Sequence, residues 1–220
     1  MKVAEDKRKI SERKFWSKVA KNYDRWIESA FSDQYKIFKS KLASYVKSHD
    51  RILEVGCGTG DITFFLSSRC KEAIGVDISL EMIAEANRKK EEQGIRNVKF
   101  YEGDAYNLPF PSASFDKLFV VNALQTMKEP DSAIREGERV LRNNCEFLSI
   151  TYCFGDSGFV ENLKLIKWIL IYGKPKYWHN FTIDNLTDYY KRIGFTIIEK
   201  EIIWKKPVVL FLRCRKEPRN

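Results

Sequence analysis

A short apolar run that ends in three alternating glycines constrains this chain more than any other feature. The run Ile52-Leu53-Glu54-Val55 precedes glycines at positions 56, 58 and 60. The run is typical of a buried strand, and glycines permit the positive φ angles of a sharp turn into a helix. A turn without Cβ atoms also lets a ligand approach the backbone, where the free N–H groups of the next helix face it. The pattern predicts a strand–turn–helix unit that binds a ligand.

Strand and helix patterns alternate after this turn. We expect strands at residues 51–55, 73–77, 98–102, 115–121 and 146–151, and helices at 61–68, 79–93 and 131–141. Such alternation indicates right-handed βαβ units and a parallel sheet covered on both faces. The first fifty residues are helical by apolar spacing. Towards the end we expect helices at residues 162–172 and 182–192, and then an antiparallel hairpin of 196–204 with 208–215.

Length and composition favour one domain. A chain of 220 residues with 44% hydrophobic residues can bury a single large core, whereas two domains would each bury little. Residues 1–10 are charged and lack the apolar run of a secretory signal, and residues 165–172 form too short an apolar stretch to span a bilayer. Five cysteines without a CxxC pair argue against a disulfide framework or a metal site. We therefore expect a cytoplasmic protein.

The net charge of +9 is unevenly distributed. Residues 1–50 carry 13 basic and 7 acidic side chains, residues 51–160 carry 13 and 17, and residues 161–220 carry 13 and 6. The basic flanks suit an acidic substrate, a membrane surface or nucleic acid. A solvated, lysine-rich surface also explains the basic flanks, and we favour this interpretation over binding to a specific polyanion.

Two carboxylates follow the next two predicted strands. Asp77 lies 17 residues after Gly60, where a carboxylate can accept hydrogen bonds from a ribose diol. Asp104 follows the third strand, where it and the next backbone N–H could contact an adenine edge. Because carboxyl ends of parallel strands share one edge of the sheet, these groups converge on one crevice with the glycine turn.

These motifs together resemble the class I S-adenosylmethionine-dependent methyltransferases, and among them the small-molecule group that includes the quinone-biosynthesis methyltransferases. The resemblance covers residues 15–152. It is carried by Leu53-Glu54-Val55-Gly56-Cys57-Gly58-Thr59-Gly60, Gly75-Val76-Asp77-Ile78-Ser79, Gly103-Asp104-Ala105, Leu108-Pro109-Phe110 and Ser114-Phe115-Asp116. Upstream, Val19-Ala20-Lys21-Asn22-Tyr23-Asp24 resembles the lid helix of the family.

The resemblance implies a Rossmann-like three-layer α/β sandwich, with a seven-stranded, mostly parallel sheet, a reversed terminal strand and N-terminal lid helices. It implies four parts of one domain, namely a helical lid (1–50), a cofactor-binding core (51–152), a substrate-cap insertion (153–181) and a C-terminal helix and hairpin (182–220). The cofactor would be S-adenosyl-L-methionine. The implied cofactor-binding residues are Tyr23, Glu54, Gly56, Cys57, Gly58, Gly60, Asp77, Ile78, Met82, Asp104, Ala105 and Asn122.

Within this set the resemblance assigns roles. Glu54 and the glycine turn would hold the methionine end of the cofactor, Asp77 the ribose hydroxyls, and Asp104 with Ala105 the adenine. Residues 122–125 would lie beside the methyl group, and Tyr23 would close over the cavity.

The sequence departs from the family in two places. Asn143-Asn144 stands where many relatives have Pro-Gly-Gly before the fifth strand, and asparagine tolerates the left-handed conformation of such a turn. Gln125-Thr126 stands where relatives often carry histidine, which excludes a histidine base there. The substrate class therefore stays open.

Methyl transfer needs mainly in-line alignment of the nucleophile and exclusion of water. A hydroxyl or ammonium acceptor would also need a general base, for which His179, Tyr23 and Asp24 are hypotheses. A surface or capping role is the simpler interpretation of His179, and a packing role is as plausible for Tyr23.

Three functional interpretations remain at this point. The first is a methyltransferase acting on a small molecule, with a membrane-associated quinone or lipid acceptor as a variant motivated by the basic, aromatic flanks. RNA methylation is a weaker alternative suggested by the pI of about 9.2. From another class, a dinucleotide-binding oxidoreductase or a non-catalytic nucleotide-binding protein would use a similar glycine turn.

Overall fold

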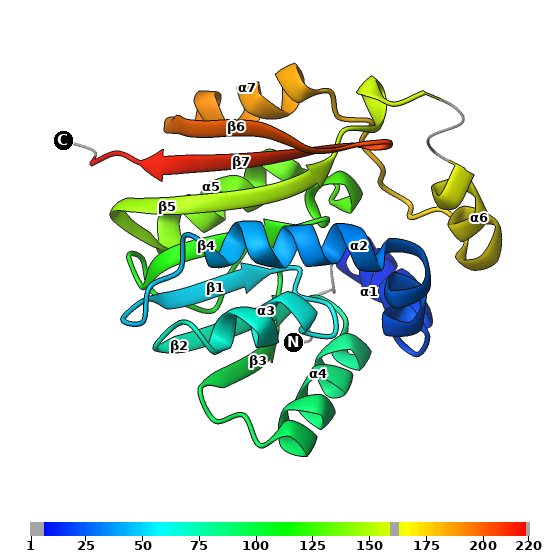
Figure 1. Ribbon diagram of the computed structural model, residues 1–220, viewed down its shortest axis with the longest axis horizontal. Coiled ribbons are helices and arrows are strands. Elements are labelled where there is room, and N and C mark those ends of the chain that lie inside the picture. Colours follow the sequence, from blue (N-terminus) through cyan, green and yellow to red (C-terminus); the bar gives the residue numbers. More distant parts are fainter. Residues whose placement is uncertain (1–6, 159–162, 219–220) are drawn as a thin grey trace.

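A single seven-stranded sheet organises the molecule (Figure 1). The computed structural model describes residues 7–158 and 163–218. The strand order is β3-β2-β1-β4-β5-β7-β6. The strands are β1 (Arg51–Val55), β2 (Glu72–Asp77), β3 (Val98–Glu102), β4 (Phe115–Val121), β5 (Leu141–Tyr152), β6 (Phe195–Lys205) and β7 (Val208–Lys216).

The sheet is parallel except at its last strand. β1 pairs in parallel with β2 and β4, while β7 runs antiparallel to both of its neighbours, β5 and β6. In Figure 1 the arrowhead of β7 accordingly points opposite to that of β5. The predicted Rossmann-like sheet with its reversed terminal strand and C-terminal hairpin is confirmed.

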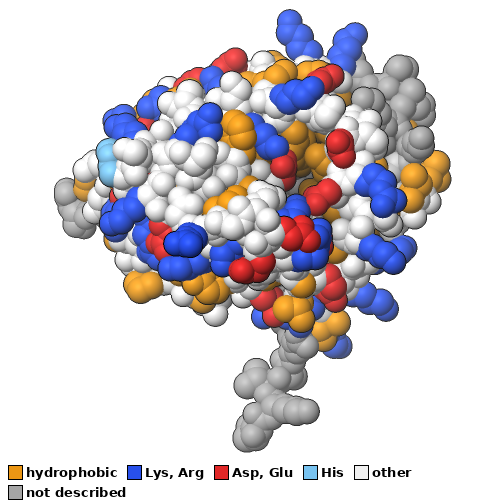
Figure 2. Space-filling model, turned by 60° about the horizontal axis from the view of Figure 1, so that its bottom comes forward, with side chains coloured by type: hydrophobic (Ala, Val, Ile, Leu, Met, Phe, Trp, Pro, Cys, Tyr) orange, Lys and Arg blue, Asp and Glu red, His pale blue; other side chains and the backbone are white. Residues whose placement is uncertain are grey.

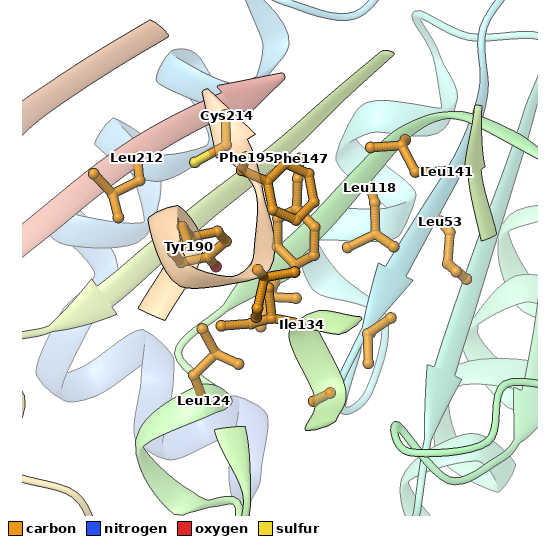
Figure 3. Packing of buried hydrophobic residues seen from close by; sticks show 14 of the residues in the cluster. Leu53, Leu118, Leu124, Ile134, Leu141, Phe147, Tyr190, Phe195, Leu212 and Cys214 are labelled. Atoms are coloured by element: carbon orange, nitrogen blue, oxygen red, sulfur yellow. The ribbon is translucent and has the colours of Figure 1, made fainter. Parts of the chain in front are cut away.

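Helices cover both faces of the sheet. The helices are α1 (Lys7–Ala20), α2 (Tyr23–Ala43), α3 (Asp61–Ser67), α4 (Leu80–Gln93), α5 (Pro130–Val140), α6 (Leu163–Tyr172) and α7 (Ile183–Ile193), with 3-10 turns η1 (Leu124–Thr126) and η2 (Phe154–Asp156). On one face α2, α3 and α4 bury Phe38, Leu66 and Ala86 against the strands. On the other face Ile134 of α5 and Tyr190 of α7 pack on β5 and β7, as Figure 3 shows. The three-layer arrangement follows from these two cores.

Local sequence signals set several element ends as predicted. The Ser79 hydroxyl accepts the N–H of Met82 at the start of α4, and Gly94 ends that helix with φ 62°. Thr182 and Asn185 form a reciprocal capping box at the start of α7. These side chains satisfy N–H groups that a helix leaves without partners.

Helices α1 and α6 lie together beyond the carboxyl ends of the parallel strands, at the right of Figure 1. Trp16 of α1 and Trp168 of α6 have ring centroids 6.4 Å apart, and Trp168 is 5.5 Å from Trp26 of α2. We call α1, α6 and the first turns of α2 the roof. Segments distant in sequence thus cover the sheet edge at which the predicted site residues gather.

The turn before the fifth strand differs from the prediction. We expected Asn143-Asn144 to form a turn outside the strand, but β5 already begins at Leu141, which pairs with Phe115 of β4. The register then shifts before Lys117 pairs with Glu146. Asn144 has φ 60°, so the predicted left-handed asparagine is confirmed, but it sits at an irregularity within the strand.

Two other expectations concern the chain surface and ends. Across residues 7–158 and 163–218 no helix is long and apolar enough to cross a bilayer. Figure 2 shows basic side chains interleaved with acidic ones over much of the visible face. The predicted start of a helix at Asn162 and the first six residues of the charged N-terminus lie outside the described residues.

Candidate functional site

The glycine turn adopts the predicted left-handed conformations. Gly56, Gly58 and Gly60 have φ angles of 74°, 53° and 86°. A Cβ atom on Gly56 would lie 2.6 Å from the Cβ atom of Ala123, and one on Gly60 would lie 2.6 Å from the ring of Phe100. Contacts this short cannot be accommodated, so both backbone angle and space require glycine at these positions.

Asp77 links this turn to the loop after β2. One of its carboxylate oxygens accepts the backbone N–H of Gly58 at 2.9 Å, and the other accepts the N–H of Ser79 at 2.9 Å. Burial raises the pKa of Asp77 above its ordinary value, against the lowering effect of these backbone hydrogen bonds. A carboxylate oxygen can accept more than one hydrogen bond, so both oxygens retain capacity for the hydroxyls of a ligand.

A cavity opens beside the glycine turn, and we call it the glycine-turn cavity. The empty space between its walls, open solvent included, is about 690 Å³. It lies at the carboxyl ends of the parallel strands, where open α/β sheets bind ligands. Nine residues of the predicted cofactor-binding set line it: Tyr23, Gly56, Gly58, Asp77, Ile78, Met82, Asp104, Ala105 and Asn122. The fold therefore brings together residues drawn from α2, the glycine turn and the loops after β2, β3 and β4.

Three residues of the predicted set are not among those that line this cavity in the described chain. The carboxyl group of Glu54 accepts the hydroxyl hydrogen of Thr63 in α3, and burial raises the pKa of Glu54 to about 8. Cys57 is buried in the core on the α2–α4 face, and Gly60 packs against Phe100. Their contribution to cofactor binding stays a prediction and would act through the shape of the turn.

Arg8 of α1 is a site residue that the sequence analysis missed. Its guanidinium forms ion pairs with Asp104 and, at 2.9 Å, with Glu12. It also lies 4.3 Å from the ring centroid of Tyr106, a cation–π contact. Arg8 and Glu12 line the glycine-turn cavity, so α1 forms one of its walls. No local sequence signal relates Arg8 to Asp104, because 96 positions separate them.

A second cavity adjoins the first under the roof, and we call it the aromatic cavity. The empty space between its walls, open solvent included, is about 650 Å³. Its walls include the side chains of Trp16, Tyr23, Trp26, Phe31, Tyr35, Tyr152, Phe154, Trp168 and Trp178. Trp16, Tyr23, Asn122 and Thr126 line both cavities. These shared residues mark the place where ligands in the two cavities would meet.

The structure separates the three candidate bases. Tyr23 lies at the junction of the two cavities, and burial together with its hydrogen bond to Tyr35 raises its pKa well above the ordinary value. A phenol with a raised pKa stays neutral near pH 7, which makes Tyr23 a weak base there.

Asp24 and His179 do not line either cavity in the described chain. Asp24 accepts hydrogen bonds from Thr59 and Lys89. The Nε2 atom of His179 lies 2.8 Å from the carbonyl oxygen of Met127, which can only accept, so this nitrogen donates. The backbone N–H of His179 donates to Gln125 O at 2.8 Å. These contacts give His179 a positioning role behind η1 and do not support its candidacy as a base.

The comparisons with known proteins agree with this geometry. A family model described as "Methyltransferase domain" matches residues 46–194. A phosphatidylethanolamine N-methyltransferase of Cereibacter sphaeroides is 30% identical over 77% of this chain and 84% of its own length. The uncharacterized methyltransferase YcgJ of Bacillus subtilis is 35% identical over 48% of this chain. The chain spans 42% of that relative's length. A ubiquinone/menaquinone biosynthesis C-methyltransferase of Bartonella tribocorum is 30% identical over 61% of this chain and 55% of its own.

Solved structures share the fold at low identity. The DhpI structure, determined as a complex with SAH, superposes with a TM-score of 0.76 at 18% identity, covering 96% of this chain and 98% of the other. The crystal structure of YcgJ from Bacillus gives a TM-score of 0.68 at 18% identity, covering 84% and 100%. The chain therefore belongs to the methyltransferase-domain family, among the class I S-adenosylmethionine-dependent methyltransferases.

Proposed function

We propose that the chain transfers a methyl group from S-adenosylmethionine to a small, largely apolar molecule held in the aromatic cavity. The observation that carries this proposal is the junction of the two cavities at Tyr23, Asn122 and Thr126. A cofactor in one cavity and an acceptor in the other would meet there, shielded by the roof. Fixing two reactants in line can contribute on the order of 7–11 kcal/mol to the lowering of a barrier.

The residues of the glycine-turn cavity fit the cofactor. The unhindered backbone at Gly56 and Gly58 accommodates its methionine end, and the Asp77 carboxylate suits the ribose diol. Asp104 and the adjacent backbone suit the adenine, next to Arg8. When bound, the cofactor supplies a methyl group on a sulfonium, which needs no further activation. The protein has then to bind, align and exclude water.

Calorimetric titration with S-adenosylmethionine and S-adenosylhomocysteine tests this proposal directly. Replacing Asp77 with alanine removes a charge-assisted contact, and should weaken binding by about 1.5–3 kcal/mol, or roughly ten- to a hundredfold. The matched control is Asp33→Ala, because Asp33 is exposed on α2, where it pairs with the nearby Lys36. Absence of binding by freshly stripped protein would overturn the proposal.

A membrane-associated acceptor is the second candidate. Two relatives are named for phosphatidylethanolamine methylation and for ubiquinone and menaquinone biosynthesis, and the molecules in these names are water-insoluble. In this chain Leu170 and Ile171 of α6 are 81% and 55% exposed beside the aromatic cavity, and the flanking segments are basic. Exposed apolar side chains next to basic ones are typical of interfacial contact.

Co-sedimentation with anionic vesicles at low salt tests this second candidate. We expect binding that falls when Leu170 and Ile171 are both replaced by glutamate, and that is weaker on zwitterionic vesicles. Equal recovery of wild type and double variant in the supernatant would count against it. We also propose that the protein is cytoplasmic. From the cytoplasm it would reach the inner surface of the cell membrane.

A further inference from the structure

The aromatic cavity has an unusual chemical composition. Four of the five tryptophans of the chain line it, namely Trp16, Trp26, Trp168 and Trp178. Among the described residues, none with a charged side chain lines it. The faces of such rings attract cations as well as apolar groups. A ligand here meets π-systems and contacts neither a carboxylate nor a basic side chain.

Three residues that line this cavity carry buried polar atoms without hydrogen-bond partners. Gln125 is 5% exposed, and its Nε2 atom donates to the carbonyl oxygen of Asn122 at 3.0 Å. That carbonyl can only accept, so the orientation of the amide is fixed and its Oε1 atom is the free end. Oε1 has no hydrogen-bond partner. A buried polar atom without a hydrogen-bond partner destabilises the fold, which favours a ligand that donates to this oxygen.

A second oxygen of the same kind lies at the junction of the cavities. The Oδ1 atom of Asn122 is buried and also lacks a partner. Asn122 has φ 53°, an uncommon backbone conformation that for a residue other than glycine often marks a functional position. The Nε1 atom of Trp168 is a third buried atom without a partner, and it is a donor. The residues that line the cavity thus carry two hydrogen-bond acceptors near η1 and one donor in the roof that lack partners.

Two oxygens that accept hydrogen bonds favour some methyl acceptors over others. A neutral primary amine presents two N–H donors and one lone pair, so it can donate to both oxygens while its lone pair faces the methyl carbon. An alcohol or phenol loses its only donor when it is deprotonated for attack, and the resulting oxyanion would face two amide oxygens. A carbon nucleophile presents no strong donor at all.

We propose that the aromatic cavity binds a primary amine carried on an apolar body, held through N–H donation to Gln125 and Asn122. This inference rests on the proposed function, and it names the acceptor class of the same site. The amine enters as an ammonium ion attracted by the tryptophan faces. Desolvation and a neighbouring positive charge both favour release of its proton to water, because both disfavour the charged form.

The transfer step then balances without a basic side chain. The nitrogen lone pair forms a bond to the methyl carbon as the sulfur–methyl bond breaks, and the electrons of that bond stay on sulfur. The nitrogen becomes a positively charged methylammonium, which releases one proton to water. Each methylation of a primary amine removes one N–H donor, so the product loses contacts to the two oxygens and leaves more readily.

Tryptophan fluorescence of the complete chain with S-adenosylhomocysteine present provides a binding readout that is independent of turnover. The probes are 4-phenylbutylamine, its N,N,N-trimethylammonium analogue and 4-phenylbutan-1-ol, which share one apolar body. We expect the amine to bind most tightly. Gln125→Leu should weaken amine binding about five- to tenfold and leave the trimethylammonium probe unaffected, because that probe has no N–H.

Matched variants distinguish the possible failures. Gln93→Leu makes the same replacement at an exposed position of α4 and should change nothing. Gln125→Glu should strengthen amine binding. A gain of affinity cannot result from a folding defect, so this variant tests the role of Gln125 even if the leucine variant misfolds. Tighter binding of the alcohol than of the amine, or equal effects of Gln125→Leu on all probes, would overturn the inference. Asp77→Ala should weaken cofactor binding roughly ten- to a hundredfold while the amine still binds, so the two proposals can fail independently of each other.

Discussion

The buried carboxyl group of Glu54 makes the stability of the protein depend on pH in an unusual direction. Glu54 is 3% exposed, and burial raises its pKa from 4.5 to about 8. The folded protein therefore holds this proton more tightly than the unfolded chain does. The resulting stabilisation is fully present below about pH 4.5 and is lost as pH rises towards 8. At 1.36 kcal/mol per pKa unit the total is on the order of 5 kcal/mol.

Replacing Glu54 with glutamine should remove this dependence, since glutamine keeps an oxygen for the Thr63 hydroxyl and cannot ionise. The assay is urea unfolding followed by circular dichroism from pH 5 to pH 9. The variant should gain several kcal/mol relative to wild type over this range, with the gain centred between pH 5 and pH 8. Subtracting the two curves cancels groups that titrate alike in both proteins.

Glu91→Gln provides the matched control, because it makes the same change at a side chain that is 79% exposed on α4. Its difference curve should be flat. A constant difference between wild type and Glu54→Gln across the range would refute the reasoning, because it would mean that Glu54 ionises in the fold as easily as in the unfolded chain.

Three further outcomes follow from contacts at the site. Arg8→Ala removes the ion pair that joins α1 to Asp104, so amide hydrogen exchange in α1 should become faster while that of β1 stays unchanged. Unchanged exchange in α1 would mean that this ion pair does not hold α1 in place. Gly58→Ala forces φ 53° on a residue with a Cβ atom, and should cost about 1–2 kcal/mol of stability in urea unfolding and weaken cofactor binding by calorimetry. His179→Ala should cost about 1 kcal/mol and leave the pH–rate profile unchanged, whereas a lost limb of that profile would restore the histidine as a base.

Much of the sheet was predictable because its signals are local. The bounds of β1, β3 and β4 coincide with the predicted strands, since each is a short run whose buried residues are apolar, Glu54 excepted, and each is flanked by polar residues or glycine. Ser79 and Gly94 set the ends of α4 for the same reason. The converging residues Asp77 and Asp104 followed from strand order alone, because carboxyl ends of parallel strands share an edge.

The missed features depend on tertiary contacts. The ion pair of Arg8 with Asp104 and the ring packing of Trp16 against Trp168 join segments that no periodicity relates. The early start of β5 at Leu141 depends on pairing with Phe115 across an irregular register. The side chain of Glu54 turns towards Thr63 and does not line the glycine-turn cavity in the described chain, so its contact with the cofactor stays a prediction.

The roof has a consequence for how such proteins diversify. Helices α1 and α2 precede residue 46, where the match to the family model begins, yet they contribute Trp16, Tyr23 and Trp26 to the aromatic cavity. Trp16 and Tyr23 line both cavities, whereas Trp26 lines only the aromatic cavity, which under the proposed function would hold the acceptor. If the proposed function holds, substitutions at positions such as Trp26 would change substrate preference over generations while the methyl-donor site stays intact, and kinship in the core would then carry little information about the molecule that is methylated.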